Sequence, residues 1–305
     1  MKRGWIVNVL LLAAVVALGW YVLYRPAPSD VPQHKLTTLV PSTVSHVLIE
    51  PRAGGPIELA KRGEAWYLVR PFEARADRSQ VDRLLELTSA SSKEKLAATD
   101  LARFDLDRPA VSVTLGDQRF AFGTVNPLNQ EQYVQAGDAV YLLPSFYASL
   151  VPQRAERLLT HALFVEGETP VAFALPAFRV EQQGPKWIRV PAGAKEPPSQ
   201  DEFNRWVEGW RFASSLVTQR ASSGTAKERI DVRLSDGRTL KLDVLQKEPE
   251  LILVRPDEKL QFLFSGEVAK RLLTPPEAAA PANDAAASGV PAAGTAASAV
   301  PAQAR

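Results

Sequence analysis

The chain has 305 residues, of which 46% are hydrophobic, and this length accommodates about two domains of 100–200 residues each. Its 36 Lys and Arg residues nearly balance 34 Asp and Glu residues, giving a formal net charge of +2, so the sequence lacks the concentrated basic charge that nucleic-acid binding requires. Cysteine is absent, which excludes disulfides, thiolate metal ligands and a cysteine nucleophile.

The first predicted element is an apolar segment from Trp5 to Tyr24, with the sequence WIVNVLLLAAVVALGWYVLY. It contains no charged residue, and about 20 such residues match the thickness of a bilayer, so we expect a transmembrane helix that contacts membrane lipid. Because Lys2 and Arg3 precede it, the positive-inside rule places residues 1–4 in the cytoplasm and everything after Arg25 on the other side of the membrane. The alternative is a signal peptide that is cleaved after the small residues at 17–19.

A proline-interrupted linker is expected over residues 25–41, and two related modules follow it, over residues 42–160 and 161–274. The same order of features recurs in both at a spacing of about 120 residues. A glycine turn leads into a Trp-bearing strand that ends at proline, then come a capped helix, two further hairpins and a final helix. In the first module these features fall at 61–71, 77–88 and 111–122, followed by a strand pair that turns at 136–138 and a final helix near 145–159. In the second module they fall at 183–191, 199–210 and 230–244, followed by a strand pair that turns at 256–257 and a final helix near 266–273.

Each module has a helix that is predicted to begin at a capping box. Asp77 with Gln80, and Ser199 with Glu202, have the spacing at which side chains satisfy the free amide groups of a helix start. Apolar residues follow at helical spacing in both helices, so one face of each is expected to pack on a sheet. In the second helix this face includes Trp206 and Trp210, which we interpret either as core residues or as contacts for a partner protein, since tryptophan is enriched at interface hot spots.

Helices inserted among antiparallel hairpins, without regular alternation of single strands and helices, predict an α+β fold in which each module is a sheet covered by its helices. Residues 275–305 contain mainly Ala, Pro, Gly and Ser and almost no large apolar side chain. Such a segment cannot bury a core, so a disordered tail is expected.

No catalytic, cofactor-binding or metal-binding motif stands out. The three histidines (His34, His46 and His161) have no metal-ligand spacing, and the phosphate-binding and nucleophile-elbow motifs are missing. Asp100, Asp105 and Asp107 cluster in one segment and could supply an acid and a base, but we favour a solvated loop. We therefore predict no catalytic residue, no cofactor and no metal.

One amide-rich loop, residues 123–131, lies between two predicted strands. Asn126, Asn129 and Gln130 could hydrogen-bond to a peptide or a glycan, and loops of this composition are also ordinary connections between strands. They are the candidate ligand contacts of the first module.

A set of motifs in the first module occurs in a recognisable order: Lys61–Trp66, Pro71, Asp77, Val81, Phe104–Pro109, Gly123 and Tyr133. With these motifs the chain resembles a bacterial family catalogued as domain of unknown function 4340 (DUF4340), roughly from Val44 to Leu159, with the second module as a possible further copy. The family pattern usually has glycine where this chain has Asp105. The resemblance implies no activity or catalytic residues. It implies N-terminally anchored bacterial envelope proteins, with the anchor in the inner membrane and the body in the periplasm, some of them similar to auxiliary components encoded with ABC transporters of the gliding-motility type.

Together these features predict a single-pass membrane protein that is a non-enzymatic accessory or scaffold component of an envelope complex and binds another envelope protein. The alternative is an extracytoplasmic enzyme or ligand-binding protein that acts on an envelope polymer, with carboxylates contributed by distant loops.

Overall fold

The computed structural model describes residues 3–23, 32–192, 197–222 and 224–277. The chain divides into two compact units, residues 1–159 (unit 1) and 160–305 (unit 2). Helix α1 covers Arg3–Leu23, but no helix in the described residues has both the length and the apolar character that crossing a membrane requires. The predicted transmembrane element is corrected accordingly. The predicted tail from residue 278 onward, and the linker up to residue 31, lie outside the described residues.

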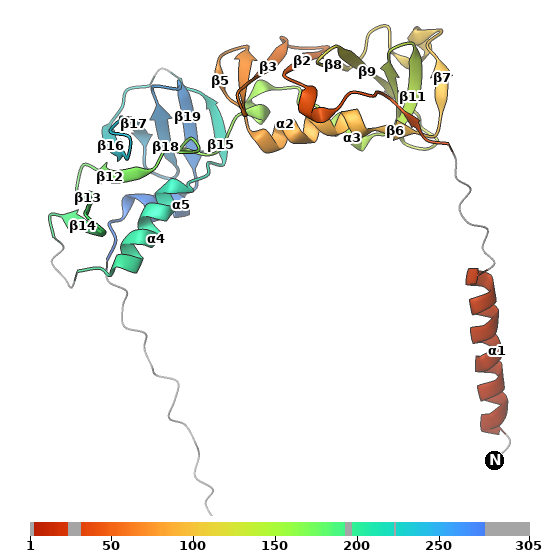
Figure 1. The fold of residues 1–305 in the computed structure, drawn as a ribbon, viewed down its shortest axis with the longest axis horizontal. Helices are drawn as coiled ribbons and strands as arrows, with labels where there is room; N and C mark the ends of the chain where they lie inside the picture. Colours follow the sequence, from red (N-terminus) through yellow and green to blue (C-terminus); the bar gives the residue numbers. More distant parts are fainter. Residues whose placement is uncertain (1–2, 24–31, 193–196, 223, 278–305) are drawn as a thin grey trace, which may run out of the picture. The chain divides into compact units, whose positions relative to one another are not determined.

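The predicted α+β class is wrong, because the protein is mostly β-sheet, with 40% strand and 23% helix. Its described strands form three antiparallel sheets of nine, eight and two strands. The main helices are short, eight residues in α2 and twelve in α4. The hairpins of each unit join edge to edge into one large sheet, whereas the helices only cover part of a face (Figure 1).

The nine-stranded sheet of unit 1 has the order β5-β4-β3-β2-β8-β9-β10-β11-β7. Alternate residues point into its core, as in β2, where Val47 and Ile49 are fully buried between half-buried neighbours. Its strands are β2 (His46–Pro51), β3 (Ile57–Arg62), β4 (Ala65–Arg70), β5 (Ala74–Arg75), β7 (Lys95–Ala97), β8 (Val111–Leu115), β9 (Gln118–Val125), β10 (Glu131–Ala136) and β11 (Ala139–Pro144).

Helix α2 (Arg78–Leu85) lies along one face of this sheet, with α3 (Phe146–Ser149) on the same side (Figure 1). The predicted final helix over 145–159 is broken at Pro152, which cannot continue a helix interior. It consists of α3 and the 3-10 turn η4 (Ala155–Leu158). The other 3-10 turns of unit 1 are η1 (Pro41–Thr43), η2 (Glu86–Ser89) and η3 (Leu101–Phe104).

Part of the expected linker packs on unit 1. Strand β1 (His34–Lys35) pairs with β6 (Ser91–Ser92) in the two-stranded sheet, and Leu36 is buried. Residues 34–36 of the expected linker are therefore part of the folded unit 1.

The eight-stranded sheet of unit 2 has the order β14-β13-β12-β16-β17-β18-β19-β15. Strand by strand, this order corresponds to that of unit 1 from β4 through β11 to β7. Its strands are β12 (Pro170–Ala174), β13 (Arg179–Gln183), β14 (Lys186–Val190), β15 (Val217–Arg220), β16 (Glu228–Leu234), β17 (Thr239–Gln246), β18 (Leu251–Arg255) and β19 (Leu260–Phe264). Helices α4 (Gln200–Arg211) and α5 (Gly266–Leu273) lie side by side over one face of this sheet (Figure 1).

Candidate protein-binding groove

Helix α4 starts where the sequence predicts, because its first turn is capped from both directions. The Ser199 hydroxyl accepts a hydrogen bond from the backbone N–H of Glu202, and the Glu202 carboxylate accepts one from the backbone N–H of Ser199 at 2.6 Å. This reciprocal cap fixes the register in which the apolar face of α4 meets the sheet. In α2 the carboxylate of Asp77 accepts from the backbone N–H groups of Ser79 and Gln80.

The two tryptophans of α4 lie in the core of unit 2. Trp210 is fully buried and Trp206 is 8% exposed, and the rings of Phe173 and Phe178 surround Trp206 at centroid distances of 5.0 and 5.9 Å. The structure therefore places both tryptophans according to the core interpretation, and Trp210 has no surface to offer a partner.

Both indole N–H groups donate to the end of α5. Trp210 Nε1 lies 3.1 Å from the carbonyl oxygen of Leu272, and Trp206 Nε1 lies 2.8 Å from that of Thr274. Carbonyl groups at a helix C-terminus have no partner within the helix, so the indoles satisfy them and tie α4 to α5.

A groove of about 660 Å³ opens between the outer side of α4 and the chain that leaves α5. We name it the α4–α5 groove. Its surface is mainly apolar, and its lining also includes acidic and basic residues. The lining residues are Glu202, Arg205, Trp206, Glu208, Gly209, Phe212, Ala213, Ser214, Val268, Arg271, Leu272 and Thr274–Glu277.

Two residues give the α4–α5 groove its character. Phe212, just after α4, is 70% exposed although it is a large apolar side chain. Gly209 lies within α4, and a Cβ atom added there would meet nothing within 4 Å, so the glycine leaves open space beside the helix. Sequence periodicity did not single out either residue, since Phe212 falls outside the helix and Gly209 carries no side chain.

The side-chain amides of the amide-rich loop form hydrogen bonds within the loop. The side-chain oxygen of Asn126 accepts from the backbone N–H of Leu128 at 3.0 Å, that of Asn129 accepts from the N–H of Glu131 at 3.1 Å, and the amide of Gln130 donates to the carbonyl of Pro127. Asn129 and Gln130 are exposed. These hydrogen bonds hold the turn between β9 and β10, so the structure supports the interpretation as a strand connection.

The carboxylates around η3 lie at the surface, where Asp100, Asp105 and Asp107 are all exposed. Asp105 and Asp107 line a surface hollow together with Arg52 and Arg108. Asp105 caps η3 with φ of 56°, a left-handed conformation that favours glycine.

The three histidines lie on different elements, His34 on β1, His46 on β2 and His161 near the start of unit 2. His46 on β2 lies 2.9 Å from the carboxylate of Glu58, whereas His161 lies near Ser215 in unit 2. No group of three or more His, Asp or Glu side chains among the described residues has a geometry that could hold a metal ion.

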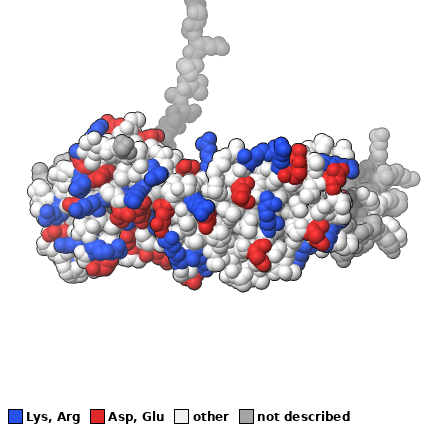
Figure 2. Space-filling model, turned by 90° about the horizontal axis from the view of Figure 1, so that it is seen from above, with Lys and Arg blue, Asp and Glu red and all other residues white. Residues whose placement is uncertain are grey.

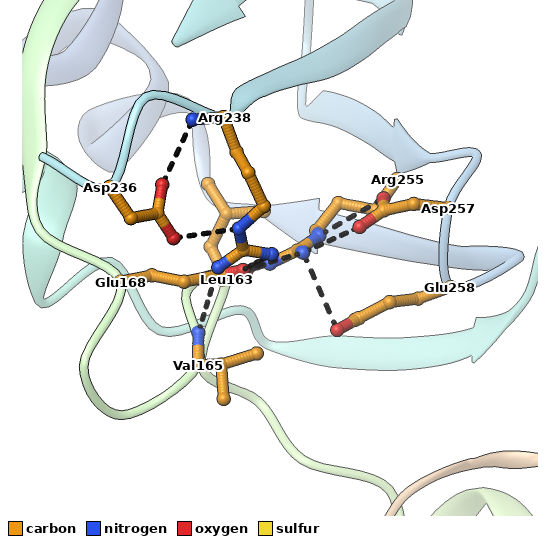
Figure 3. A network of polar contacts seen from close by, with 8 residues as sticks. All are labelled: Leu163, Val165, Glu168, Asp236, Arg238, Arg255, Asp257 and Glu258. Atoms are coloured by element: carbon orange, nitrogen blue, oxygen red, sulfur yellow. Dashed lines mark hydrogen bonds and ion pairs between the residues drawn. The ribbon is translucent and has the colours of Figure 1, made fainter. Parts of the chain in front are cut away.

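A buried ion network in unit 2 has no counterpart in the sequence predictions (Figure 3). Arg255 ends β18 and is 1% exposed. Its guanidinium donates to Glu168 at 2.9 and 3.2 Å, to Asp257 at 2.7 Å and to the carbonyl of Leu163 at 2.8 Å. The sequence signal that could have revealed this network is the arginine at the end of the apolar run LILVR. A charged residue in a buried strand seldom lacks a partner.

The guanidinium of Arg255 is fully paired with groups of unit 2, so we interpret this network as structural. Burial alone would lower the pKa of Arg255, but its hydrogen bonds to Asp257 and Glu168 outweigh that effect and raise the pKa, keeping the guanidinium charged. Glu168 also accepts from the backbone N–H of Val165 at 2.8 Å. The network thereby fastens the segment that enters unit 2 to the turn between β18 and β19.

Acidic and basic side chains are interspersed over the visible face of both units, without a large patch of one sign (Figure 2). The α4–α5 groove is instead mainly apolar, with both acidic and basic residues in its lining, and protein interfaces commonly combine an apolar core with polar surroundings.

The chain matches the model of the family described as domain of unknown function (DUF4340) over residues 66–209. That match covers less than half of the chain, and it runs from β4 of unit 1 to Gly209 of α4 in unit 2, so it crosses the boundary between the units. No curated protein and no solved structure matches the chain.

Proposed function

We propose that this protein is a non-enzymatic accessory or scaffold component of a bacterial envelope complex, and that it holds a partner protein in the α4–α5 groove. The observation that carries the proposal is the groove itself, where a large aromatic side chain, Phe212, is 70% exposed beside an apolar hollow. Exposed apolar surface of this kind marks interaction sites on soluble domains.

The proposal includes a cellular location. We place this function on the periplasmic side of the bacterial inner membrane, as the resemblance of residues 66–209 to the DUF4340 family implies. An enzymatic reporter that is active only outside the cytoplasm, fused after residue 277, is expected to be active. Activity restricted to a cytoplasmic reporter at the same position contradicts this location.

The groove is tested with variants that fill or flatten it in the full chain. Gly209→Leu places a side chain in the open space, and Phe212→Ser removes the exposed ring. Both are expected to reduce recovery of a stoichiometric partner after mild detergent purification and cross-linking by at least about tenfold, since the loss of one central anchor costs about 1.4 kcal/mol or more.

The matched control is Gly209→Ala, which adds one carbon atom at the same place. Alanine raises helix stability by about 0.8–1 kcal/mol relative to glycine, so this variant should be more stable and retain the partner. If the wild-type chain is repeatedly recovered alone, or if Gly209→Leu and Gly209→Ala retain a partner equally, the groove is not the binding site.

A further inference from the structure

The α4–α5 groove carries an exposed ring and an open space close together. Phe212 is 70% exposed, and an added Cβ atom at Gly209, three residues earlier, would meet nothing within 4 Å. The backbone N–H of Phe212 still donates to the carbonyl of Glu208 at 2.9 Å, so Phe212 continues the helical geometry of α4, in which residues three apart share a face. Both residues line the same hollow of about 660 Å³. One face of α4 therefore presents a knob and a hole.

The ring of Phe212 is held in position although it is exposed. The guanidinium carbon of Arg211 lies 5.4 Å from the ring centroid, a distance at which a cation is attracted to an aromatic face. A side chain that is already positioned loses less conformational entropy when it binds. Phe212 is thus suited to insert into a partner surface.

The groove favours a helix over an extended peptide as its occupant. The indole N–H groups of Trp206 and Trp210 already donate to the carbonyl groups of Thr274 and Leu272, so they are not available to peptide carbonyls. An extended segment on this mainly apolar surface would leave backbone polar groups unpaired, whereas an α-helix satisfies them within itself. Helix α4 of another copy meets this requirement.

The charged residues in the lining of the groove balance each other. Arg205 and Arg271 are basic, Glu208 and Glu277 are acidic, and all four are exposed. The remaining charged residue, Glu202, is used at the start of α4, where its carboxylate accepts hydrogen bonds. A surface with charge of one sign repels its own copy, whereas a balanced surface of both signs can pair with itself.

These properties describe a surface that fits itself. We propose that the partner held in the α4–α5 groove is a second copy of this chain, related by a two-fold axis, with Phe212 of each copy filling the space beside Gly209 of the other. In such an interface every contact occurs twice, and the glycine lets the two α4 helices approach closely. The inference rests on the proposed function of the groove and names its partner.

The test uses two versions of the full chain with different affinity tags, co-expressed and purified in mild detergent. We expect each tag to recover the other version, and sedimentation equilibrium to show a change from one chain to two as the concentration rises from about 1 µM to about 1 mM. Phe212→Ser and Gly209→Leu should each weaken the dimer at least about hundredfold, because a loss of about tenfold per contact occurs twice.

Two matched variants should keep the dimer. Phe146→Ser removes a ring that is 52% exposed on unit 1, and Gly209→Ala adds only one carbon atom in the groove. A chain that stays monomeric over the whole concentration range overturns the inference. A dimer that Phe212→Ser and Gly209→Leu leave unchanged overturns it as well, because such a dimer is held by another surface.

The inference and the proposed function can fail separately. If the chain is monomeric and a photoreactive amino acid at Phe212 captures a different protein, the groove binds a partner and the second copy is the wrong one. If the chain is monomeric and nothing is captured at Phe212, both proposals are wrong.

Discussion

At the scale of single residues, Gly123 shows why a sequence motif can be structural. It lies on β9, and a Cβ atom built there would be 2.1 Å from the carbonyl oxygen of Phe104 and 3.0 Å from the side chain of Leu106. The segment that contains Phe104 and Leu106 covers the second face of the sheet beside Ala121 and Val140. The segment with Phe104 and Leu106 therefore packs directly against Gly123, and this close packing requires a residue without a side chain.

Gly123→Ala is expected to destabilise unit 1 by about 1–3 kcal/mol, because the backbone of η3 must move away from the added carbon. The measurement is the free energy of unfolding from urea denaturation. Gly209→Ala is the control, since its Cβ meets nothing within 4 Å. A Gly123→Ala variant as stable as the wild type contradicts this account of the motif.

Arg255 and Glu168 define a second residue-scale prediction. Arg255→Met leaves Glu168 buried without its main partner, and breaking a buried pair in this way costs about 3–5 kcal/mol. Adding Glu168→Leu removes the stranded charge, so the double variant should recover most of the lost stability. Unfolding free energies of the two single variants and the double variant form the cycle, and additive losses are the result that contradicts the described network.

At the scale of elements, the same network makes the turn between β18 and β19 sensitive to acid. Burial alone would raise the pKa of Asp257, but its hydrogen bond with Arg255 and the charge of Arg255 outweigh burial and hold the pKa below its usual 3.8. A carboxylate whose pKa is lower in the folded state stabilises the fold above the unfolded pKa. That contribution is lost as the pH falls through the folded pKa.

We therefore expect the stability difference between the wild type and Asp257→Asn to stay constant near neutral pH and to shrink below about pH 4, the ordinary pKa of aspartate. Thermal unfolding of both proteins over a series of pH values measures it. A difference that is independent of pH down to strongly acidic conditions shows that Asp257 does not titrate with folding.

Local sequence patterns identified elements well. The turns at Gly63, Gly116, Gly137 and Gly184 connect hairpins as predicted, and each has a positive φ that glycine adopts without strain. The helix over 266–273 is confirmed with the predicted bounds. These features depend on residues that are close in sequence, so their signals are complete within a short window.

Features that depend on distant pairing could not be read in the same way. β2 pairs with β8, and β7 pairs with β11, across many intervening residues, and these pairings turn separate hairpins into large sheets. The predicted α+β class failed for this reason. The α4–α5 groove was missed for a similar reason, because it needs α4 and the end of α5 together, although Trp206 at its edge had been singled out.

At the scale of the whole molecule, two units with corresponding strand orders carry different surfaces. Unit 2 has an apolar groove with Phe212 at its edge, and unit 1 has a surface hollow whose lining includes Arg154 and Arg157. Under the proposed function, the sheet of unit 2 is a scaffold and the α4–α5 groove beside it is the binding surface. The fold alone does not define that function.

The most direct test of the groove is site-specific photo-cross-linking in living cells. A photoreactive amino acid at Phe212 in the full chain is expected to capture one protein reproducibly, whereas the same amino acid at the exposed residue Arg233 should not capture it, and Gly209→Leu should abolish the product. Capture of the same protein from both positions, or no product at Phe212, contradicts the proposal that the α4–α5 groove binds a partner.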